Sequence, residues 1–259
     1  MFAWLQKIVA PPRAIPDALW QRTLAQYSFL ASQPALGQAG LRTLTAQFLA
    51  QKEFSGAHAL VVTDAMAVAI AAQACLPVLN LGLQLYDDFT GIVVHPGPML
   101  AQRREVDAAG VVHHYREVLV GEAMQGGPVT LSWHDVAASG ALAEHGHNVV
   151  IHEFIHKIDM HPSAGGQANG CPPLPSHTAR AKWRSTMQAA FEEFNNRLVM
   201  AERFGAEPPW LDAYGATAPA EFFAVAAEAY FVNAPRFEAE FATLTALFDA
   251  FFKGEQIPG

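Results

Sequence analysis

The segment His152-Glu153-Phe154-Ile155-His156 combines residue types and a spacing that suit hydrolytic chemistry at a metal ion. If it is helical, the two histidines lie on one face with their Cβ atoms about 5–6 Å apart. Both imidazoles can then reach one tetrahedral zinc ion at roughly 2.0–2.1 Å. Glu153 lies beside the pair, where it can act as general base on water without taking a coordination position. The pattern predicts a zinc site that hydrolyses peptide bonds.

The alternative interpretation is that both histidines are core residues that need no metal. The segment is strongly apolar, with Val or Ile at positions 149–151, 155 and 158 and Phe at 154. A helix of this kind is expected to be buried, and two histidines and a glutamate buried there need polar partners. A metal ion supplies them, so we favour the metal site.

A catalytic zinc site usually takes three protein ligands plus water, so a third ligand is needed. Asp159 and Pro162 stand where a metzincin has its Gly and final His, which excludes that family. Four nearby histidines are open alternatives: His145, His147, His161 and His177. The favoured candidate is Glu221, 65 residues after His156, in the first turn of a helix that begins at Pro219.

Glu221 also has a purely structural interpretation, because the helix dipole favours an acidic residue near a helix N-terminus. Tyr214 precedes it by seven residues. There its phenol could donate a hydrogen bond to the oxyanion that develops on a substrate carbonyl. This combination favours Glu221 as a ligand and Tyr214 as a catalytic residue.

Composition excludes several classes of protein. A net charge of −8 and scattered Lys and Arg residues argue against direct contact with nucleic acid. Cys75 and Cys171 form no CxxC pair and are expected to be reduced thiols, which predicts a cytoplasmic protein. The start of the chain lacks the pattern of a secretion signal. The most apolar window, Ala65–Leu79, is too short to cross a bilayer, so we expect a buried helix and no membrane contact.

The order of elements is predicted to be helix, then sheet, then helix, which is an α+β chain. Runs rich in β-branched and aromatic residues predict a small, mainly antiparallel sheet with strands at 91–95, 111–120 and 129–133. Helices are expected at 18–30, 41–52, from Thr63 or Asp64 to Pro77, at 147–160, at 178–204, and in two segments that open near Pro219 and Pro235. The Gly- and Pro-rich stretch 161–177 is expected to be a loop.

Four blocks, Ala71–Gly82, Gly127–Trp133, Asn148–Met160 and Tyr214–Ala224, resemble the bacterial Mlc titration factor A family of zinc-dependent peptidases, also called DgsA anti-repressors. The resemblance runs from about residue 15 to 235. The catalytic part is also similar to the last domain of anthrax lethal factor. The sequence shows no internal repeat and no linker, so we expect residues 1–259 to form a single domain, which the resemblance implies is a zincin-like metallopeptidase. Its helical part is expected over 1–80, and the sheet, the HExxH helix and the C-terminal helices over 81–259.

The resemblance implies one zinc ion per chain with His152, His156 and Glu221 as ligands, Glu153 as catalytic base and Tyr214 as the transition-state phenol. The chain departs from lethal factor at Val225, where that protein has a second glutamate four residues after its ligand. Another carboxylate must then orient the histidines, and Glu228 and Asp159 are the candidates, each of which could equally be a solvated or capping acid.

The resemblance leaves three hypotheses about function open. Family members are associated with aminopeptidase-type activity on small peptides. The family name records binding of a transcriptional repressor of glucose-uptake genes, so the chain could act by sequestering a repressor of the Mlc type, with peptidase activity secondary. A zinc-stabilised scaffold without turnover is the third, and it predicts unfolding on chelation. The strand Val129–Trp133 could offer an open edge to an extended peptide substrate or be a core strand.

Overall fold

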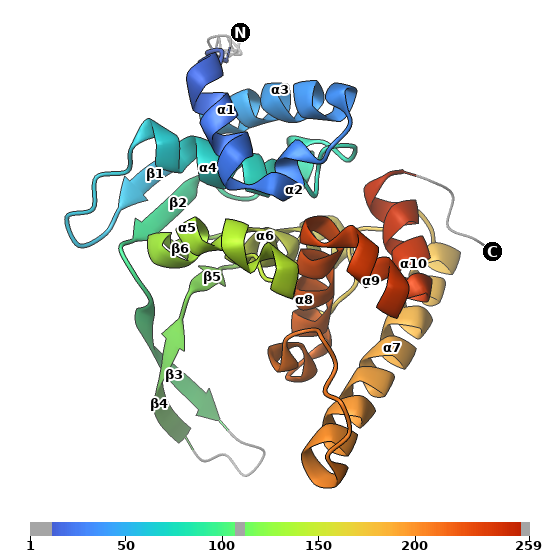
Figure 1. Ribbon diagram of the computed structural model, residues 1–259. Helices are drawn as coiled ribbons and strands as arrows, with labels where there is room; N and C mark the ends of the chain where they lie inside the picture. Colours follow the sequence, from blue (N-terminus) through green and yellow to red (C-terminus); the bar gives the residue numbers. More distant parts are fainter. Residues whose placement is uncertain (1–11, 107–111, 255–259) are drawn as a thin grey trace, which may run out of the picture.

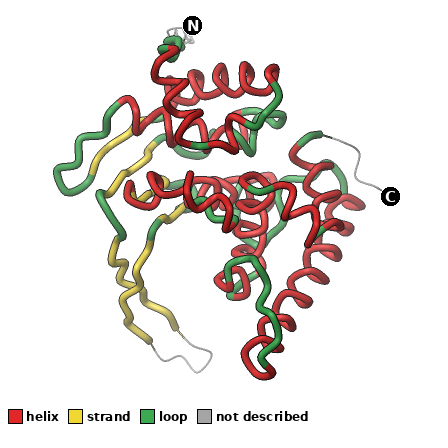
Figure 2. The backbone as a smooth tube through the Cα atoms, in the orientation of Figure 1, coloured by secondary structure: helices red, strands yellow, loops and turns green. Residues whose placement is uncertain are grey.

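The computed structural model describes residues 12–106 and 112–254 and is mainly helical with a small four-stranded sheet and a two-stranded ribbon (Figures 1 and 2), which confirms the α+β fold class. Nearly all of its described buried apolar residues belong to one cluster that runs from Ile15 to Phe252. Such a shared core is what a single domain needs, and the single-domain organisation stays a prediction. No helix among the described residues is long and apolar enough to span a bilayer.

The N-terminal helices are α1 (Asp17–Gln26), α2 (Ser28–Ala31), α3 (Ala35–Gln51) and α4 (Asp64–Cys75). The helix expected over 18–30 is divided at Tyr27, whose backbone leaves the helical region. The Thr63 side chain caps α4 by accepting a hydrogen bond from the Met66 N–H, and most of α4 is buried, as predicted. Helix α4 packs against α6 (Val149–Asp159) and so connects the N-terminal helices to the rest of the molecule (Figure 1).

The sheet has the strand order β1–β2–β6–β5, formed by β1 (Glu53–Gly56), β2 (Gly91–His95), β6 (Val129–Ser132) and β5 (Gly121–Ala123). The pairs β1–β2 and β2–β6 are parallel and only β5–β6 is antiparallel, so the mainly antiparallel orientation was wrong for this sheet. The sequence pattern missed β1, which reaches β2 through the α4 crossover that a parallel pair needs. β6 is paired on both sides, so it is a core strand, and β1 and β5 form the two edges of the sheet.

The strands β3 (Met99–Val106) and β4 (Val112–Leu119) form a separate antiparallel ribbon that projects from the body (Figures 1 and 2). The predicted strand over 111–120 therefore corresponds to β4, with position 111 outside the described residues. After Val120 the chain enters the sheet as β5. The segment from Val112 to Ala123 thus contributes one strand to the ribbon and one to the sheet.

The C-terminal half is helical: α5 (Trp133–Leu142), α6, α7 (His177–Phe204), α8 (Pro219–Val232), α9 (Ala234–Glu240) and α10 (Ala242–Phe252). The long helix and the helix beginning at Pro219 are confirmed. Three helices close the described chain rather than two, because the backbone leaves the helical region at Phe241, between α9 and α10. Cys75 and Cys171 are both free and both buried.

Candidate metal centre

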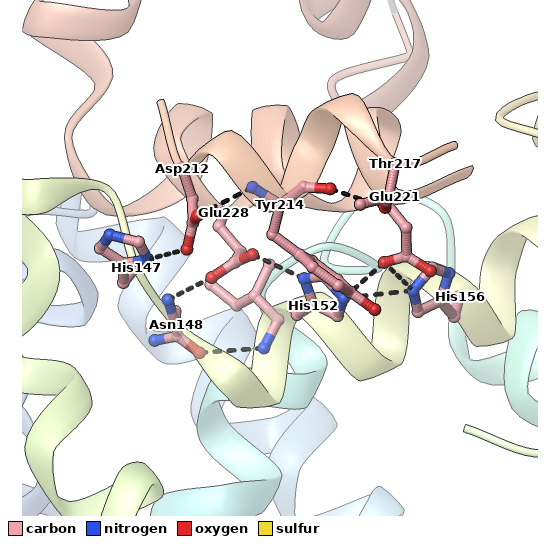
Figure 3. A network of polar contacts seen from close by, with 10 residues as sticks. His147, Asn148, His152, His156, Asp212, Tyr214, Thr217, Glu221 and Glu228 are labelled. Carbon is pink, nitrogen blue, oxygen red and sulfur yellow. Dashed lines mark hydrogen bonds and ion pairs between the residues drawn. The ribbon is translucent and has the colours of Figure 1, made fainter. Parts of the chain in front are cut away.

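Helix α6 carries the HExxH residues on its one polar face. Its N-cap is Asn148, whose side-chain oxygen accepts a hydrogen bond of 2.9 Å from the Ile151 N–H. The apolar residues of the helix are buried in the core. His152 and His156 therefore point the other way, toward α8, with their ring centroids 4.8 Å apart (Figure 3).

Helix α8 brings Glu221 to the two imidazoles. Pro219 occupies the first helical position, and Glu221 follows in the first turn, ahead of a run of buried Phe and Ala residues. One Glu221 carboxylate oxygen, Oε2, lies 3.1 Å from Nε2 of His152 and 3.2 Å from Nε2 of His156 (Figure 3). The two Nε2 atoms are 3.2 Å apart.

These three separations fit a metal ion. Two ligands of a tetrahedral zinc ion with bonds of roughly 2.0–2.1 Å are about 3.3 Å apart. Two imidazole nitrogens and a carboxylate oxygen are also ligand types that zinc takes in hydrolytic sites. Among the described residues, these three form the one group of His, Cys, Asp and Glu side chains with ligand atoms gathered closely enough to hold an ion.

The alternative histidine ligands lie elsewhere. His145 is next to Glu144, and His161 contacts Ser163. His177 opens α7. His147 lies in the same cleft as His152 but pairs with Asp212 at 3.5 Å. Glu221, rather than any of these histidines, joins the pair on α6.

The electrostatics of the cluster favour a cation. Burial alone would lower the pKa of His152, but the Glu228 charge and hydrogen bonds to Glu221 and Glu228 raise it well above its usual value. Burial works against ionisation of Glu221, yet hydrogen bonds and the charges of both histidines hold its pKa well below the usual range. The carboxylates thus stabilise positive charge between them, which a divalent ion supplies.

Glu153 and Tyr214 line the cleft that His152 also lines, and this cleft has a volume of about 520 Å³. Glu153 is 5% exposed, and burial raises its pKa although the charges of His152 and His156 oppose the shift. Tyr214 lies on the short helix η4 (Ala213–Ala216), is 45% exposed and has its ring 6.0 Å from that of His152. The structure therefore gathers all five predicted site residues.

Glu228 supplies the carboxylate that orients a histidine, the role for which lethal factor has a glutamate at the position of Val225. Its Oε1 lies 2.7 Å from Nδ1 of His152, on the side of the ring opposite Glu221, and its Oε2 accepts a hydrogen bond from the Asn148 N–H (Figure 3). The Asn148 side chain in turn donates to Gln73 of α4 over 2.8 Å. A carboxylate on the second nitrogen fixes the tautomer and orientation of a ligating histidine.

Asp159, the other candidate, orients the loop rather than a histidine. It accepts hydrogen bonds from the backbone N–H groups of Asn169, Gly170 and Cys171 at 2.7–3.0 Å. A Cβ on Gly170, which has φ +76°, would lie 2.7 Å from the Pro219 carbonyl oxygen. Asp159 thereby holds the loop against the first turn of α8, which carries the third ligand candidate.

The sequence analysis missed Lys157, which is fully buried beside His156. Its ammonium group lies 2.8 Å from Asp88 and donates to the Met124 and Gly127 carbonyls in the turn between β5 and β6. A lysine in an amphipathic helix is normally exposed to solvent. Nothing in the sequence distinguishes the buried Lys157 from such an exposed lysine. Lys157 ties the edge of the sheet to α6.

Replacing Glu228 with Gln should weaken metal binding by about 10–100-fold, the usual cost of losing such an orienting partner. The amide keeps the size of the side chain but removes the charge that faces His152. Competition with a chromophoric chelator measures the affinity. Glu238→Gln, which alters an exposed residue of α9, is the control, and wild-type affinity in Glu228→Gln would contradict the orienting role.

The cluster of His152, His156 and Glu221, with the buried Glu153 next to it, is the arrangement expected of a metallopeptidase. The comparisons with known proteins place the chain in that class. The chain belongs to the glucose-regulated metallo-peptidase M90 family, whose family model matches residues 2–253. It is 37% identical to Mlc titration factor A of Serratia proteamaculans (strain 568) over 247 residues, or 95% of this chain and 90% of that protein. It is 33% identical to Mlc titration factor A of Yersinia pestis (strain Pestoides F) over 258 residues, or 99% and 92%. The family resemblance predicted from the four blocks is confirmed.

Proposed function

We propose that the protein is a zinc-dependent peptidase of the aminopeptidase type, with His152, His156 and Glu221 as the zinc ligands. The observation that carries the proposal is the spacing of 3.1–3.2 Å among the three donor atoms, next to a cleft that is lined by His152 and the buried Glu153. Two buried thiols fit a reducing compartment, and we place the protein in the cytoplasm.

The residues of the cleft divide the chemistry among them. Zinc, when bound, would supply Lewis acidity, which makes water more acidic and polarises a carbonyl. Glu153 takes the proton from the attacking water and passes it to the leaving amine. Its raised pKa suits this exchange, since a carboxylate that both takes and gives a proton works best with a pKa near the working pH. Tyr214 donates a hydrogen bond to the oxyanion of the substrate.

Strand β5 offers a place for the substrate backbone. It is one of the two edge strands of the sheet, packs against α6, and contributes Gly121 to the cleft beside Leu119, Val120 and Glu153. An extended peptide adds to such an edge through main-chain hydrogen bonds. We therefore assign to β5 the role that the sequence had suggested for the strand over 129–133.

The lining of the cleft supports recognition of a free amine. Asp135 and Asp212 line it together with apolar side chains, and none of its described lining residues is Lys or Arg. An acidic, partly apolar cleft attracts the ammonium group of a peptide N-terminus. Peptides with free and with acetylated N-termini, assayed with zinc-loaded protein, test this: we expect turnover of the free peptides only. Equal turnover of both would make the protein an endopeptidase.

The name shared by its relatives, Mlc titration factor A, favours a second candidate function, in which the protein binds a transcriptional repressor of the Mlc type. Glu153→Gln separates the two functions. It removes the proposed base from the cleft, so a peptidase role would be lost. A stoichiometric binder would keep its affinity for the repressor, measured by calorimetry with purified repressor.

Tyr214→Phe should lower kcat by about 10²–10³-fold, the usual cost of one lost oxyanion donor. The ring and its packing 6.0 Å from His152 are retained, so metal content should not change. Steady-state kinetics together with metal analysis measure both quantities. Wild-type kcat in this variant would exclude Tyr214 from the transition state.

A further inference from the structure

Gly121 occupies a position in β5 where its backbone does not require glycine. It lies opposite Leu131 of β6, is buried, and does not have a positive φ. Glycine weakens a strand because it has no side chain to pack, and it often marks a site of close approach. The reason for a glycine here must therefore be the space around it.

That space is occupied by Glu153. A Cβ built on Gly121 would lie 2.5 Å from Oε1, 2.6 Å from Cγ and 2.8 Å from Cδ of Glu153, and these are the three nearest atoms. Ordinary contacts of a Cβ are 3.4–4 Å. The proposed base thus lies flat against the backbone of the edge strand, in the volume that any other residue at 121 would fill.

We infer that Gly121 is a positioning residue, whose missing side chain lets the Glu153 carboxylate take its place beside His152 and His156. This inference rests on the proposed peptidase function. A larger residue at position 121 must displace the Glu153 side chain rather than the strand, because hydrogen bonds fix the backbone on both sides of β5. Val120 accepts a hydrogen bond of 2.8 Å from the Ser132 N–H, and Lys157 binds the Met124 and Gly127 carbonyls in the turn that follows β5.

The consequence is a substitution that spares the fold and disables the site. In Gly121→Ala the added methyl should displace the Glu153 side chain from Cγ outward, because Cγ and Cδ as well as Oε1 lie within 2.8 Å of the added carbon, and the strand should keep its pairing. A misplacement of about 1 Å in a catalytic group can cost about 10²-fold in rate. We expect kcat to fall by about that factor, with KM and metal content as in the wild type and with a fall in Tm, from the overpacking, that leaves the protein folded at the assay temperature.

The matched control is Gly97→Ala, because a Cβ on Gly97 meets no atom within 4 Å and Gly97 has no positive φ. Steady-state kinetics, metal analysis and thermal melts are measured for wild type, Gly121→Ala, Gly97→Ala, Glu153→Gln and the Gly121→Ala/Glu153→Gln double variant. If Gly121 acts through Glu153, the alanine lowers kcat in the wild-type background and adds no further loss in the glutamine background.

Four outcomes overturn the inference. Wild-type kcat in Gly121→Ala beside an inactive Glu153→Gln refutes the role of Gly121 and leaves the proposed function intact. A higher KM at unchanged kcat assigns Gly121 to substrate docking instead. A fall in Tm and metal content that accounts for the lost activity makes the glycine merely structural. Full activity in Glu153→Gln overturns the proposed function and the role of Gly121 together.

Discussion

Glu153→Gln should lower kcat/KM by about 10²–10⁴-fold, the range that general acid–base catalysis contributes. The amide has the shape of the carboxylate but cannot take a proton from water. Because the side chain is almost fully buried against Gly121, an isosteric replacement should leave the packing unchanged. The three proposed ligands are untouched, so metal content should equal that of the wild type. Kinetics on a chromogenic peptide and metal analysis of the same sample give both values.

The control for this variant is Glu193→Gln, which alters an exposed glutamate of α7 and should change neither quantity. Undiminished turnover in Glu153→Gln would remove Glu153 from the mechanism. Loss of metal together with activity would instead show that Glu153 supports the metal site, and the base would have to be sought elsewhere in the cleft.

Glu221→Ala should weaken metal binding by more than about 10²-fold, since losing a ligand should cost more than losing the partner of a ligand. Only two imidazoles would remain, and the charge that Glu221 places 3.1–3.2 Å from their nitrogens would be gone. Alanine suits a helix, so α8 should persist. Metal content after dialysis and chelator competition measure the loss.

Glu238→Ala, on the surface of α9, serves as the reference for the loss of a carboxylate remote from the cleft. Undiminished metal binding in Glu221→Ala would return attention to the nearby histidines. His147 would then be the first to replace, because it lines the same cleft as His152.

The proposed ligands could be predicted from the sequence because their signals are local. The i, i+4 spacing of His152 and His156 places two side chains on one helix face whatever the rest of the fold does. A proline at the first helical position marks the start of α8 and puts Glu221 in its first turn. Both signals depend only on helix geometry. The prediction that they meet, although 65 residues apart, rested on Tyr214 seven residues before Glu221 and on the family resemblance.

The remaining parts of the site depend on contacts between distant segments. Glu228 had been one of two candidates, and only the packing of α8 on α6 distinguishes it from Asp159. Lys157 and Gly121 gave no signal, because their roles arise where the edge of the sheet meets α6. The parallel strand pairs were missed for the same reason: β1 is short, and strand orientation depends on the path of the connection.

A crystal structure of the zinc-loaded protein, with anomalous diffraction collected at the zinc edge, tests the central claim most directly. We expect one anomalous peak per chain, bonded to Nε2 of His152, Nε2 of His156 and a carboxylate oxygen of Glu221 at roughly 2.0–2.2 Å. A peak elsewhere, or a Glu221 side chain directed away from the ion, would contradict the account.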